Sequence, residues 1–272
     1  MKNKVILFLV AGVLLAGLAW MMVQGRTRPG RDVLVICGGT MRPPMEAVIQ
    51  RYGLESKDRI LATYGDSGEI MAQLQNTGKG DVFVVHDPFM DWARQRGLAA
   101  EGAGVGYLDN VIVVPKGNPL GIRDVSDLAR NGLRLGVGDR RYSTSGVMVG
   151  QMLDAREDGA AIASNIVTEA RSHGQRCTDV ELGALDAAIV WSAAARTHAG
   201  KLEAIPIPAE AVDAVTSATY GRSDLRNVQV AIGLATPGRA NPAARRFYEF
   251  ATTRCSDIFE SAGFRLTPNK VQ

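Results

Sequence analysis

Residues that bind metal ions or carry redox chemistry are scarce in this sequence. It has three cysteines, Cys37, Cys177 and Cys255, and three histidines, which form neither a C-x-x-C pair nor a cluster at zinc-binding spacing. We therefore expect neither a bound metal nor a cofactor. If the chain is exported, Cys177 with Cys255 is the favoured disulfide, because Cys37 ends an apolar, strand-like run. Three separate buried thiols are the alternative.

Neither sign of charge predominates, and no stretch is typical of a protein that binds nucleotides or nucleic acid. The chain has 31 Lys and Arg residues against 28 Asp and Glu, a formal net charge of +3, and no basic patch interleaved with aromatic residues. It has no G-x-x-x-x-G-K loop, and Gly136 and Gly138 lack the third glycine of a dinucleotide-binding loop. Nucleic acid and nucleotides are therefore disfavoured as ligands.

A recognisable catalytic constellation is also missing. Cys37 could be paired with His86 or His173 as a nucleophile and its base, but no known nucleophile signature surrounds it. His86 and Asp87 follow a strand-like run, where they could cap the next helix or hold the geometry of their domain. We therefore do not expect an enzyme. A membrane-tethered hydrolase that uses Cys37 is the alternative from another class.

The longest apolar run lies at residues 5–23, preceded by Lys2 and Lys4. About 20 apolar residues suffice for a helix to cross a bilayer, whereas the apolar core of a signal peptide has about 7–15. A cleaved signal peptide and a retained anchor both remain open, and residues 24–31 read as a short polar linker. We expect the domain that follows to be periplasmic or otherwise extracytoplasmic, either free or tethered by residues 5–23. A tethered sensor is a further alternative if the run is retained.

Beyond residue 31 the sequence alternates between strand-like and helix-like segments, which is typical of an α/β fold with a largely parallel sheet. With 46% apolar residues the chain can bury substantial cores. The expected strands cover residues 33–36, 60–64, 82–85, 111–114, 134–137, 166–167, 187–190, 204–207 and 227–234. The expected helices cover residues 40–52, 68–75, 89–96, 126–129, 145–155, a segment ending at 182, 242–253 and 257–262. Gly53 is expected to end the first helix, and the breakers at 115–119 predict a crossing between two domains.

Three loops share one arrangement, in which a strand ends, small residues turn the chain and a hydroxyl residue begins the next helix. They lie at residues 38–40, 65–68 and 142–146. Ligands of open α/β sheets bind at the carboxyl ends of strands, and helix amino termini offer free N–H groups and a favourable dipole to an anion. Each hydroxyl alone could be an ordinary helix cap. Their repetition indicates a site for a small oxyanion.

These loops resemble the anion-binding motifs of the molybdate- and tungstate-binding proteins of ABC importers, which have the type II periplasmic binding-protein fold. The family's first loop, a strand followed by A-A-S, is similar to residues 38–40 and places Thr40 at the ligand serine. The second, S-S-G or S-S-S before a helix, is similar to residues 66–68 and places Ser67 at the ligand position. Two further segments resemble the family's A-D-L-F-I and M-D-Y-A, namely residues 80–84 and 90–93.

The resemblance continues into the second half of the chain. The family's G-D-P-x-x-x-P-A-G loop is similar to residues 138–146, which puts Ser145 where the family offers a backbone N–H to the anion. The later segments V-E-L-G and A-I-V-W resemble the family's V-E-x-G and G-I-V-Y. Counting back from Trp191, which ends the second of them, places the other backbone donor at Ser172 or His173.

Three departures from the family pattern bear on the ligand. Trp191 stands where the family has a tyrosine whose hydroxyl serves the ligand, so the donor there would be the indole N–H or would be missing. Neither Ser172 nor His173 matches the family's residue, so that assignment depends on spacing alone. Asp66, beside the site, would repel a dianion if it pointed inward, or would accept the proton of a monohydrogen oxyanion such as phosphate.

The resemblance implies a two-lobed α/β fold with crossing hinge strands. Lobe 1 would comprise residues 32–114 completed by 228–272, and lobe 2 residues 115–227. The lobes would close on molybdate or tungstate, and the protein, a monomer, would deliver the anion to an ABC permease in the membrane. Phosphate or sulfate is the alternative ligand in the same fold. Ferric ion is less expected, because the adjacent tyrosine pair favoured by such a site is absent.

Overall fold

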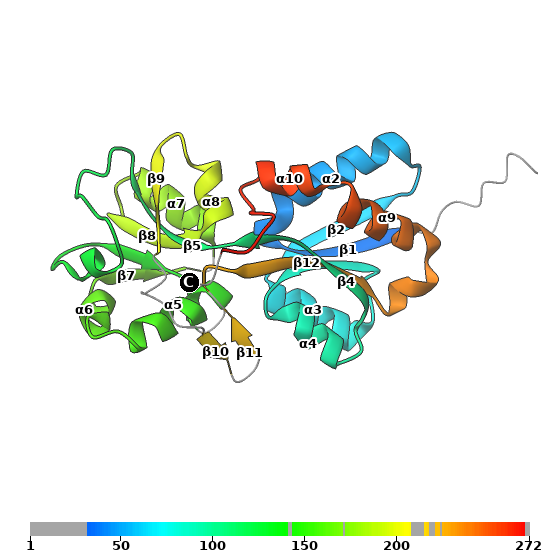
Figure 1. Cartoon of the computed structure of the whole chain (residues 1–272), viewed down its shortest axis with the longest axis horizontal. Coiled ribbons are helices and arrows are strands. Elements are labelled where there is room, and N and C mark those ends of the chain that lie inside the picture. The colour runs from blue at the N-terminus through cyan, green and yellow to red at the C-terminus, as the bar shows by residue number, and fades with distance from the viewer. Residues whose placement is uncertain are drawn as a thin grey trace, which may run out of the picture.

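The computed structural model of the protein describes residues 32–140, 143–170, 172–207, 215–217, 221–223 and 225–269. The apolar run at 5–23, the linker at 24–31 and Tyr142 of the third loop lie outside these ranges. No helix within them is long and apolar enough to cross a bilayer. Figure 1 shows two lobes, each built on a five-stranded sheet with helices on both faces.

The first lobe is built on a mixed sheet. Its strands lie in the order β2 (Ile60–Gly65), β1 (Val33–Gly38), β3 (Val82–His86), β12 (Val228–Ala235) and β4 (Ala99–Leu108). β1 pairs in parallel with β2 and β3, whereas β12 runs antiparallel to β3 and β4. The carboxyl ends of β1, β2 and β3 therefore meet at one edge of the sheet.

Side chains alternate between the two faces of this sheet, so each face has its own core. Val84 of β3 packs in the core shared with α2 (Arg42–Glu55), α9 (Pro242–Thr253) and α10 (Ser256–Ser261). Phe83, its neighbour in sequence, packs in the core formed with α3 (Ser67–Thr77) and α4 (Phe89–Gln95). The two groups of helices lie on opposite sides of the sheet (Figure 1).

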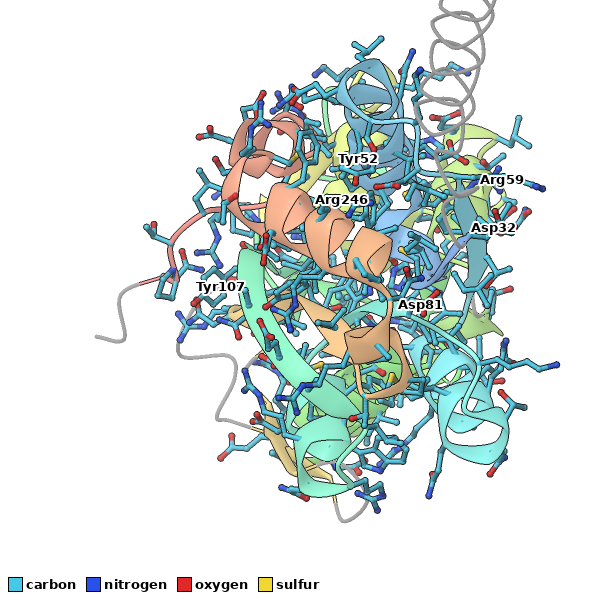
Figure 2. All side chains as sticks on the ribbon, turned by 90° about the vertical axis from the view of Figure 1, so that its right-hand side faces the viewer. Asp32, Tyr52, Arg59, Asp81, Tyr107 and Arg246 are labelled. Carbon is cyan, nitrogen blue, oxygen red and sulfur yellow. The ribbon has the colours of Figure 1, made fainter. Side chains whose placement is uncertain are left out.

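Aromatic and charged contacts join α2 to α9 on one face of the first lobe. Tyr52 of α2 packs edge-on against Phe247 and Phe250 of α9, with ring centroids 5.2 and 5.1 Å apart. The Tyr52 hydroxyl donates to Asp58 at 2.7 Å, and Arg246 of α9 donates to the same carboxylate. Figure 2 shows Tyr52 and Arg246 on these neighbouring helices. The first and last parts of the chain therefore form one lobe.

The second lobe repeats the architecture. Its sheet has the order β7 (Ile166–Glu169), β6 (Leu135–Val137), β8 (Ala187–Trp191), β5 (Asn110–Pro115) and β9 (Leu202–Pro206). β6 is parallel to β7 and β8, and β5 is antiparallel to β8 and β9. One face contacts η2 (Ser126–Ala129), α5 (Thr144–Asp154) and α6 (Gly159–Ser164), and the other contacts α7 (His173–Glu181) and α8 (Ser192–Thr197). β10 (Val215–Ser217) and β11 (Gly221–Ser223) form a separate antiparallel pair.

Two chain crossings and the carboxyl-terminal segment join the lobes. The chain leaves the first sheet at the end of β4 and enters the second at the start of β5, so the first crossing lies at Asp109. It returns before β12, where the Asn110 N–H donates to the Leu225 carbonyl at 2.9 Å. After α10 the chain runs back to this region, and Arg265 pairs with Tyr107 of β4 through both backbone groups (Figure 1).

Most predicted elements are confirmed, and two of their positions are corrected. Residues 111–114, which the sequence placed at the end of lobe 1, belong to β5 and pair with β8 and β9 of the second sheet. The run is apolar throughout because β5 is buried between these two strands. The helix expected to stop at Gly53 continues to Glu55. A glycine inside a helix costs only about 1 kcal/mol relative to alanine, which did not suffice to end this helix.

The sequence predicted no strand at residues 99–108, where the structure has β4. This strand contains glycines at positions 102, 104 and 106, which weaken any strand pattern. A Cβ atom at Gly102 would lie 2.7 Å from the Met90 sulfur, and one at Gly104 would lie 2.8 Å from the Gln229 side chain. The glycines therefore allow the close packing of α4 and β12 against β4, which local sequence patterns do not reveal.

All three cysteines are buried and free. Cys177 lies in the core of the second lobe and Cys255 in that of the first, so the alternative of a Cys177–Cys255 disulfide is wrong and that of three separate buried thiols is confirmed. Burial raises the pKa of Cys177 to about 11 and raises the pKa of Cys37 further. A Cys37 thiol held in this state is a poor nucleophile.

Candidate functional site

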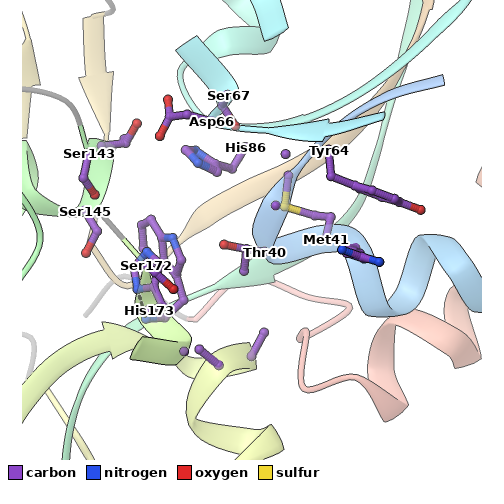
Figure 3. A pocket seen from close by; sticks show the side chains of 18 of the residues that line it. Thr40, Met41, Tyr64, Asp66, Ser67, His86, Ser143, Ser145, Ser172 and His173 are labelled. Carbon is purple, nitrogen blue, oxygen red and sulfur yellow. Dashed lines mark hydrogen bonds between the residues drawn. The ribbon is translucent and has the colours of Figure 1, made fainter. Parts of the chain in front are cut away.

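A cleft of about 680 Å³ lies between the lobes, at the edges where the parallel strands of both sheets end. All six residues predicted for the ligand line it: Thr40, Ser67, Ser145, Ser172, His173 and Trp191. Figure 3 shows labelled side chains from both lobes gathered around one space. The structure thus brings together residues that are up to 151 positions apart in the sequence (191 − 40).

The first wall of the cleft is the turn after β1. β1 ends at Gly38, and the chain passes through a single 3₁₀ turn, η1 (Gly39–Met41), directly into α2. A Cβ atom at Gly38 would lie 2.4 Å from the end of the Met41 side chain and 2.9 Å from the Ser67 hydroxyl, so a larger residue would displace these side chains. Thr40 is thereby presented to the cleft at the start of a helical segment, as the loop pattern predicted.

The second wall is the start of α3, where Asp66 and Ser67 follow β2. Asp66 is the helix cap, and its carboxylate accepts the Gly68 N–H at 2.9 Å. Ser67, the first helical residue, is only 3% exposed, and its hydroxyl has no hydrogen-bond partner among the described residues. A buried hydroxyl without a partner costs free energy, so the position implies a ligand or solvent group that completes it.

The third wall is the start of α5 in the second lobe. Ser143 caps this helix by accepting the Gly146 N–H at 3.4 Å. The Ser145 hydroxyl donates to the Asn110 side chain of β5 at 2.7 Å. The first N–H groups of a helix have no acceptor within it, and Thr144 and Ser145, which begin α5, both line the cleft. The contact expected from Ser145 is therefore available through its backbone.

The fourth wall is the start of α7. Ser172 is the helix cap and accepts the Gln175 N–H at 3.2 Å, and His173 is the first helical residue. Nδ1 of His173 lies 3.1 Å from the backbone nitrogen of Trp191 and 2.9 Å from Nη2 of Arg176. Counting back from Trp191 thus located a helix start correctly, although the hydrogen bonds of the His173 side chain were not predicted.

Three rings form the floor where the two lobes meet. Trp191 is 1% exposed and stacks on His173, with centroids 5.4 Å apart and planes inclined by 27°. Its ring also lies near that of His86 of the first lobe, with centroids 5.6 Å apart. Trp191 therefore contributes chiefly a flat apolar surface, and the use of its indole N–H by a ligand stays a prediction.

Both histidines are held neutral. Nδ1 of His86 lies 2.8 Å from the Asp87 carbonyl oxygen, and burial lowers the pKa of His86. Burial, together with Arg176 and His86, lowers the pKa of His173 well below its usual value. Within the described ranges no group of three or more His, Cys, Asp or Glu side chains could hold a metal ion. The cleft lining combines hydroxyl groups and helix amino termini, which suit an anion, with the charged residues Arg42, Asp66 and Glu69.

Sequence reasoning missed two contributors to this cleft. His86 was identified only as a helix cap, a holder of domain geometry or a base for Cys37, and Arg176 was not singled out. His86 ends a strand on the same sheet edge as Thr40, which is a signal that could have placed it in the cleft. Arg176 gives no such signal, since its importance depends on a contact with a side chain in the folded state.

This geometry agrees with comparisons to known proteins. A family model described as bacterial extracellular solute-binding protein matches residues 33–265. The chain belongs to that family, so it is an extracytoplasmic solute-binding protein and not an enzyme. Proteins of this kind work with ABC permeases.

Individual proteins are also similar to this chain in sequence or in structure. The molybdate-binding protein ModA of Mycobacterium bovis is 27% identical over 188 residues, which cover 68% of this chain and 70% of that protein. The periplasmic molybdate-binding protein of Azotobacter vinelandii has a TM-score of 0.67 at 18% identity, covering 87% of this chain and 100% of that chain. The sulfate-binding protein SubI of Mycobacterium tuberculosis has a TM-score of 0.66 at 18% identity and covers 87% of each chain. The two-lobed type II periplasmic binding-protein fold is confirmed.

Proposed function

We propose that this protein captures a tetrahedral oxyanion, molybdate or tungstate, and delivers it to an ABC importer. The observation that carries the proposal is the buried Ser67 hydroxyl, which lacks a partner at the start of α3 and lines a cleft that three further helical starts also line. Hydroxyl and N–H groups match the oxygens of such an anion, and the helix dipoles offset its charge. The molybdate-binding relatives support this choice of ligand.

The two lobes would hold the anion from opposite sides. Thr40 and Ser67 would donate from the first lobe, and the backbone N–H groups at Ser145 and His173 from the second. We place the lobe boundary at Asp109, so that β1 to β4 and β12 belong to lobe 1 and β5 to β9 belong to lobe 2. Closure about the crossings would then remove the anion from water, which strengthens every hydrogen bond to it.

The test is calorimetric titration of the purified protein with molybdate, tungstate, sulfate and phosphate, using the wild type and Ser67→Ala. Molybdate and tungstate are expected to bind the wild type, and Ser67→Ala is expected to bind them roughly 10- to 100-fold more weakly. The same variant should keep or slightly raise the melting temperature, since it removes a buried hydroxyl that has no partner. Ser164→Ala, which alters an exposed hydroxyl outside the cleft lining, is the control.

Two outcomes would contradict the proposal. If none of the four anions releases heat or raises the melting temperature, the protein does not bind an oxyanion of this class. If an anion binds but Ser67→Ala leaves its affinity unchanged, Ser67 is a helix residue without a role in the site.

A second ligand, monohydrogen phosphate, is favoured by one feature of the cleft. Asp66 and His86 both line it, and a neutral His86 that donates Nδ1–H to the Asp87 carbonyl keeps a bare lone pair on Nε2. Acceptors of this kind suit an anion that carries a proton, which molybdate, tungstate and sulfate lack at neutral pH. Phosphate binding more tightly than the other three anions would select this alternative.

A further inference from the structure

His173 receives two hydrogen bonds at one ring nitrogen. A backbone N–H can only donate, and so can a guanidinium, so Nδ1 of His173 must accept from both Trp191 and Arg176. A nitrogen that accepts twice carries no proton. The imidazole is therefore neutral, and its single proton lies on Nε2.

The two histidines of the cleft thus have opposite tautomers. His173 has its proton on Nε2 and can donate there, whereas His86 uses Nδ1–H for the Asp87 carbonyl and keeps a lone pair on Nε2. Both histidines line the same cleft, and the ring of each lies near that of Trp191. Of the two, only His173 can donate a ring hydrogen bond to an anion while it stays neutral.

Arg176 carries a buried positive charge that contacts His173. Its side chain is 0% exposed, and among the described residues it has no carboxylate within ion-pair distance. Nη1 donates to the Ala170 carbonyl, Nη2 donates to His173, and Nε has no partner in the part of the chain that the structure describes. Burial lowers the pKa of Arg176 to about 10, so the group stays charged at neutral pH. An uncompensated buried charge is costly, and an anion in the cleft would offset it.

We propose that Arg176 is a positioning residue of the binding site: together with the Trp191 N–H it holds His173 as a neutral Nε2–H donor to the bound anion. This inference rests on the proposed function. It adds the positive charge of Arg176, which acts on the ligand without contacting it. Arg176 occupies no part of the cleft lining. The charged and titratable groups that act on His173 are Arg176 on its own helix and His86 from the other lobe, and Asp66 acts in turn on His86.

The experiment compares Arg176→Met with the wild type by ¹⁵N NMR of the histidines and by titration with molybdate, tungstate, sulfate and phosphate. In the wild type the His173 signals should show one protonated nitrogen, Nε2, between about pH 5.5 and pH 8. Arg176→Met removes a donor to Nδ1 and a repelling charge, so the pKa of His173 should rise. The affinity for the anion should fall roughly 10- to 100-fold at pH 8 and recover partly at pH 5.5, where the ring becomes charged.

Variants at His173 keep the inference testable if Arg176→Met does not fold. His173→Gln retains an N–H donor near the position of Nε2 and should bind within a few-fold of wild type, whereas His173→Leu should bind as weakly as Arg176→Met. His198→Gln is the control, because His198 pairs with Glu181 outside the cleft lining. It should leave affinity and pH dependence unchanged.

The outcomes separate this inference from the proposed function. If the wild type binds an anion but Arg176→Met, or failing that His173→Leu, binds it equally well with the same pH dependence, the inference is wrong and the proposed function stands. A His173 signal with its proton on Nδ1 would also overturn it. If no anion binds the wild type, the proposed function fails, and with it the role of Arg176 toward an anion.

Discussion

Asp87 illustrates how burial changes a single carboxyl group beside the cleft. It follows His86 at the end of β3, and its side chain accepts the Gln229 N–H at 2.8 Å. Burial raises its pKa from 3.8 to about 6. The folded protein therefore holds a proton on Asp87 at pH values where the unfolded chain has lost it.

This shift predicts a dependence of stability on pH. The folded-state pKa is the higher one, so the contribution of Asp87 is most favourable below about pH 4 and is lost as the pH rises through about 6. Asp87→Asn keeps an oxygen for the Gln229 N–H and removes the buried charge, so it should raise the free energy of unfolding at pH 7 by about 1–3 kcal/mol. Chemical denaturation at pH 4 and pH 7 checks this.

At pH 4 the same substitution should have little effect. Asp154→Asn is the control of opposite sign, because Arg140 holds the pKa of Asp154 below its usual value. That variant should lose a little stability at pH 7. An equal effect of Asp87→Asn at both pH values would show that Asp87 is not protonated in the folded state.

At the scale of elements, three of the helices at the cleft start in the same way. α3, α5 and α7 each begin with a side chain that accepts an N–H from its own first turn, namely Asp66, Ser143 and Ser172. These caps satisfy only one of the free N–H groups at each helix start. The earlier N–H groups have no acceptor within the helix, and residues that carry them, among them Ser67, Ser145 and His173, line the cleft.

The start of α5 requires glycine at position 146. A Cβ atom there would lie 2.4 Å from the Asp139 carbonyl oxygen and 2.5 Å from that of Gly138. Gly146→Ala should therefore push α5 away from the preceding loop, lower the free energy of unfolding by roughly 1–3 kcal/mol and weaken anion binding. Thermal unfolding and titration with the anion measure both effects.

Gly174→Ala is the matched control in the first turn of α7. The nearest atom to its Cβ position is the Ser172 hydroxyl oxygen, at 3.9 Å, so the substitution should leave stability unchanged or slightly higher. Equal stability of the two variants would mean that the loop before α5 moves to accommodate the added Cβ atom without lowering the free energy of unfolding.

At the scale of the whole molecule, the carboxyl-terminal segment contacts both places where the chain crosses between the lobes. Arg265 donates to both carboxylate oxygens of Asp109, at 3.0 and 2.6 Å, and to the Arg226 carbonyl at 2.6 Å. Asp109 lies between β4 and β5, and its carbonyl accepts the N–H of Ser192, the residue after Trp191. The hinge is thus connected directly to the floor of the cleft.

This arrangement predicts that Arg265→Ala loosens the relative position of the lobes. The variant without ligand should have a larger radius of gyration in small-angle X-ray scattering than the wild type, and should bind the anion about 2- to 10-fold more weakly, because more motion is lost on closure. Both proteins should contract when the anion is added. Arg254→Ala, which breaks an exposed pair with Glu55 within the first lobe, should change neither quantity. Identical scattering of Arg265→Ala and the wild type would refute the role of this contact.

The sequence by itself determined the elements and the residue types at their ends. Strand and helix follow from the spacing of apolar residues, and a hydroxyl or carboxylate at a helix start follows from capping, so α9 at residues 242–253 and the helical starts at Thr40, Ser67 and Ser145 could be read locally. The likeness to a binding-protein family then placed these starts at one site, and the structure agrees with that placement.

Only the tertiary structure decided which elements meet. β5 could have joined either sheet, because an apolar run fits the centre of both, and its pairing with β8 and β9 settles the choice. His173 contacts both Arg176 and Trp191, and the sequence around each of these residues gives no sign of these contacts. The physical reason is that caps and periodicity depend on residues a few positions apart, whereas the charge and tautomer of a side chain depend on whatever the fold packs against it.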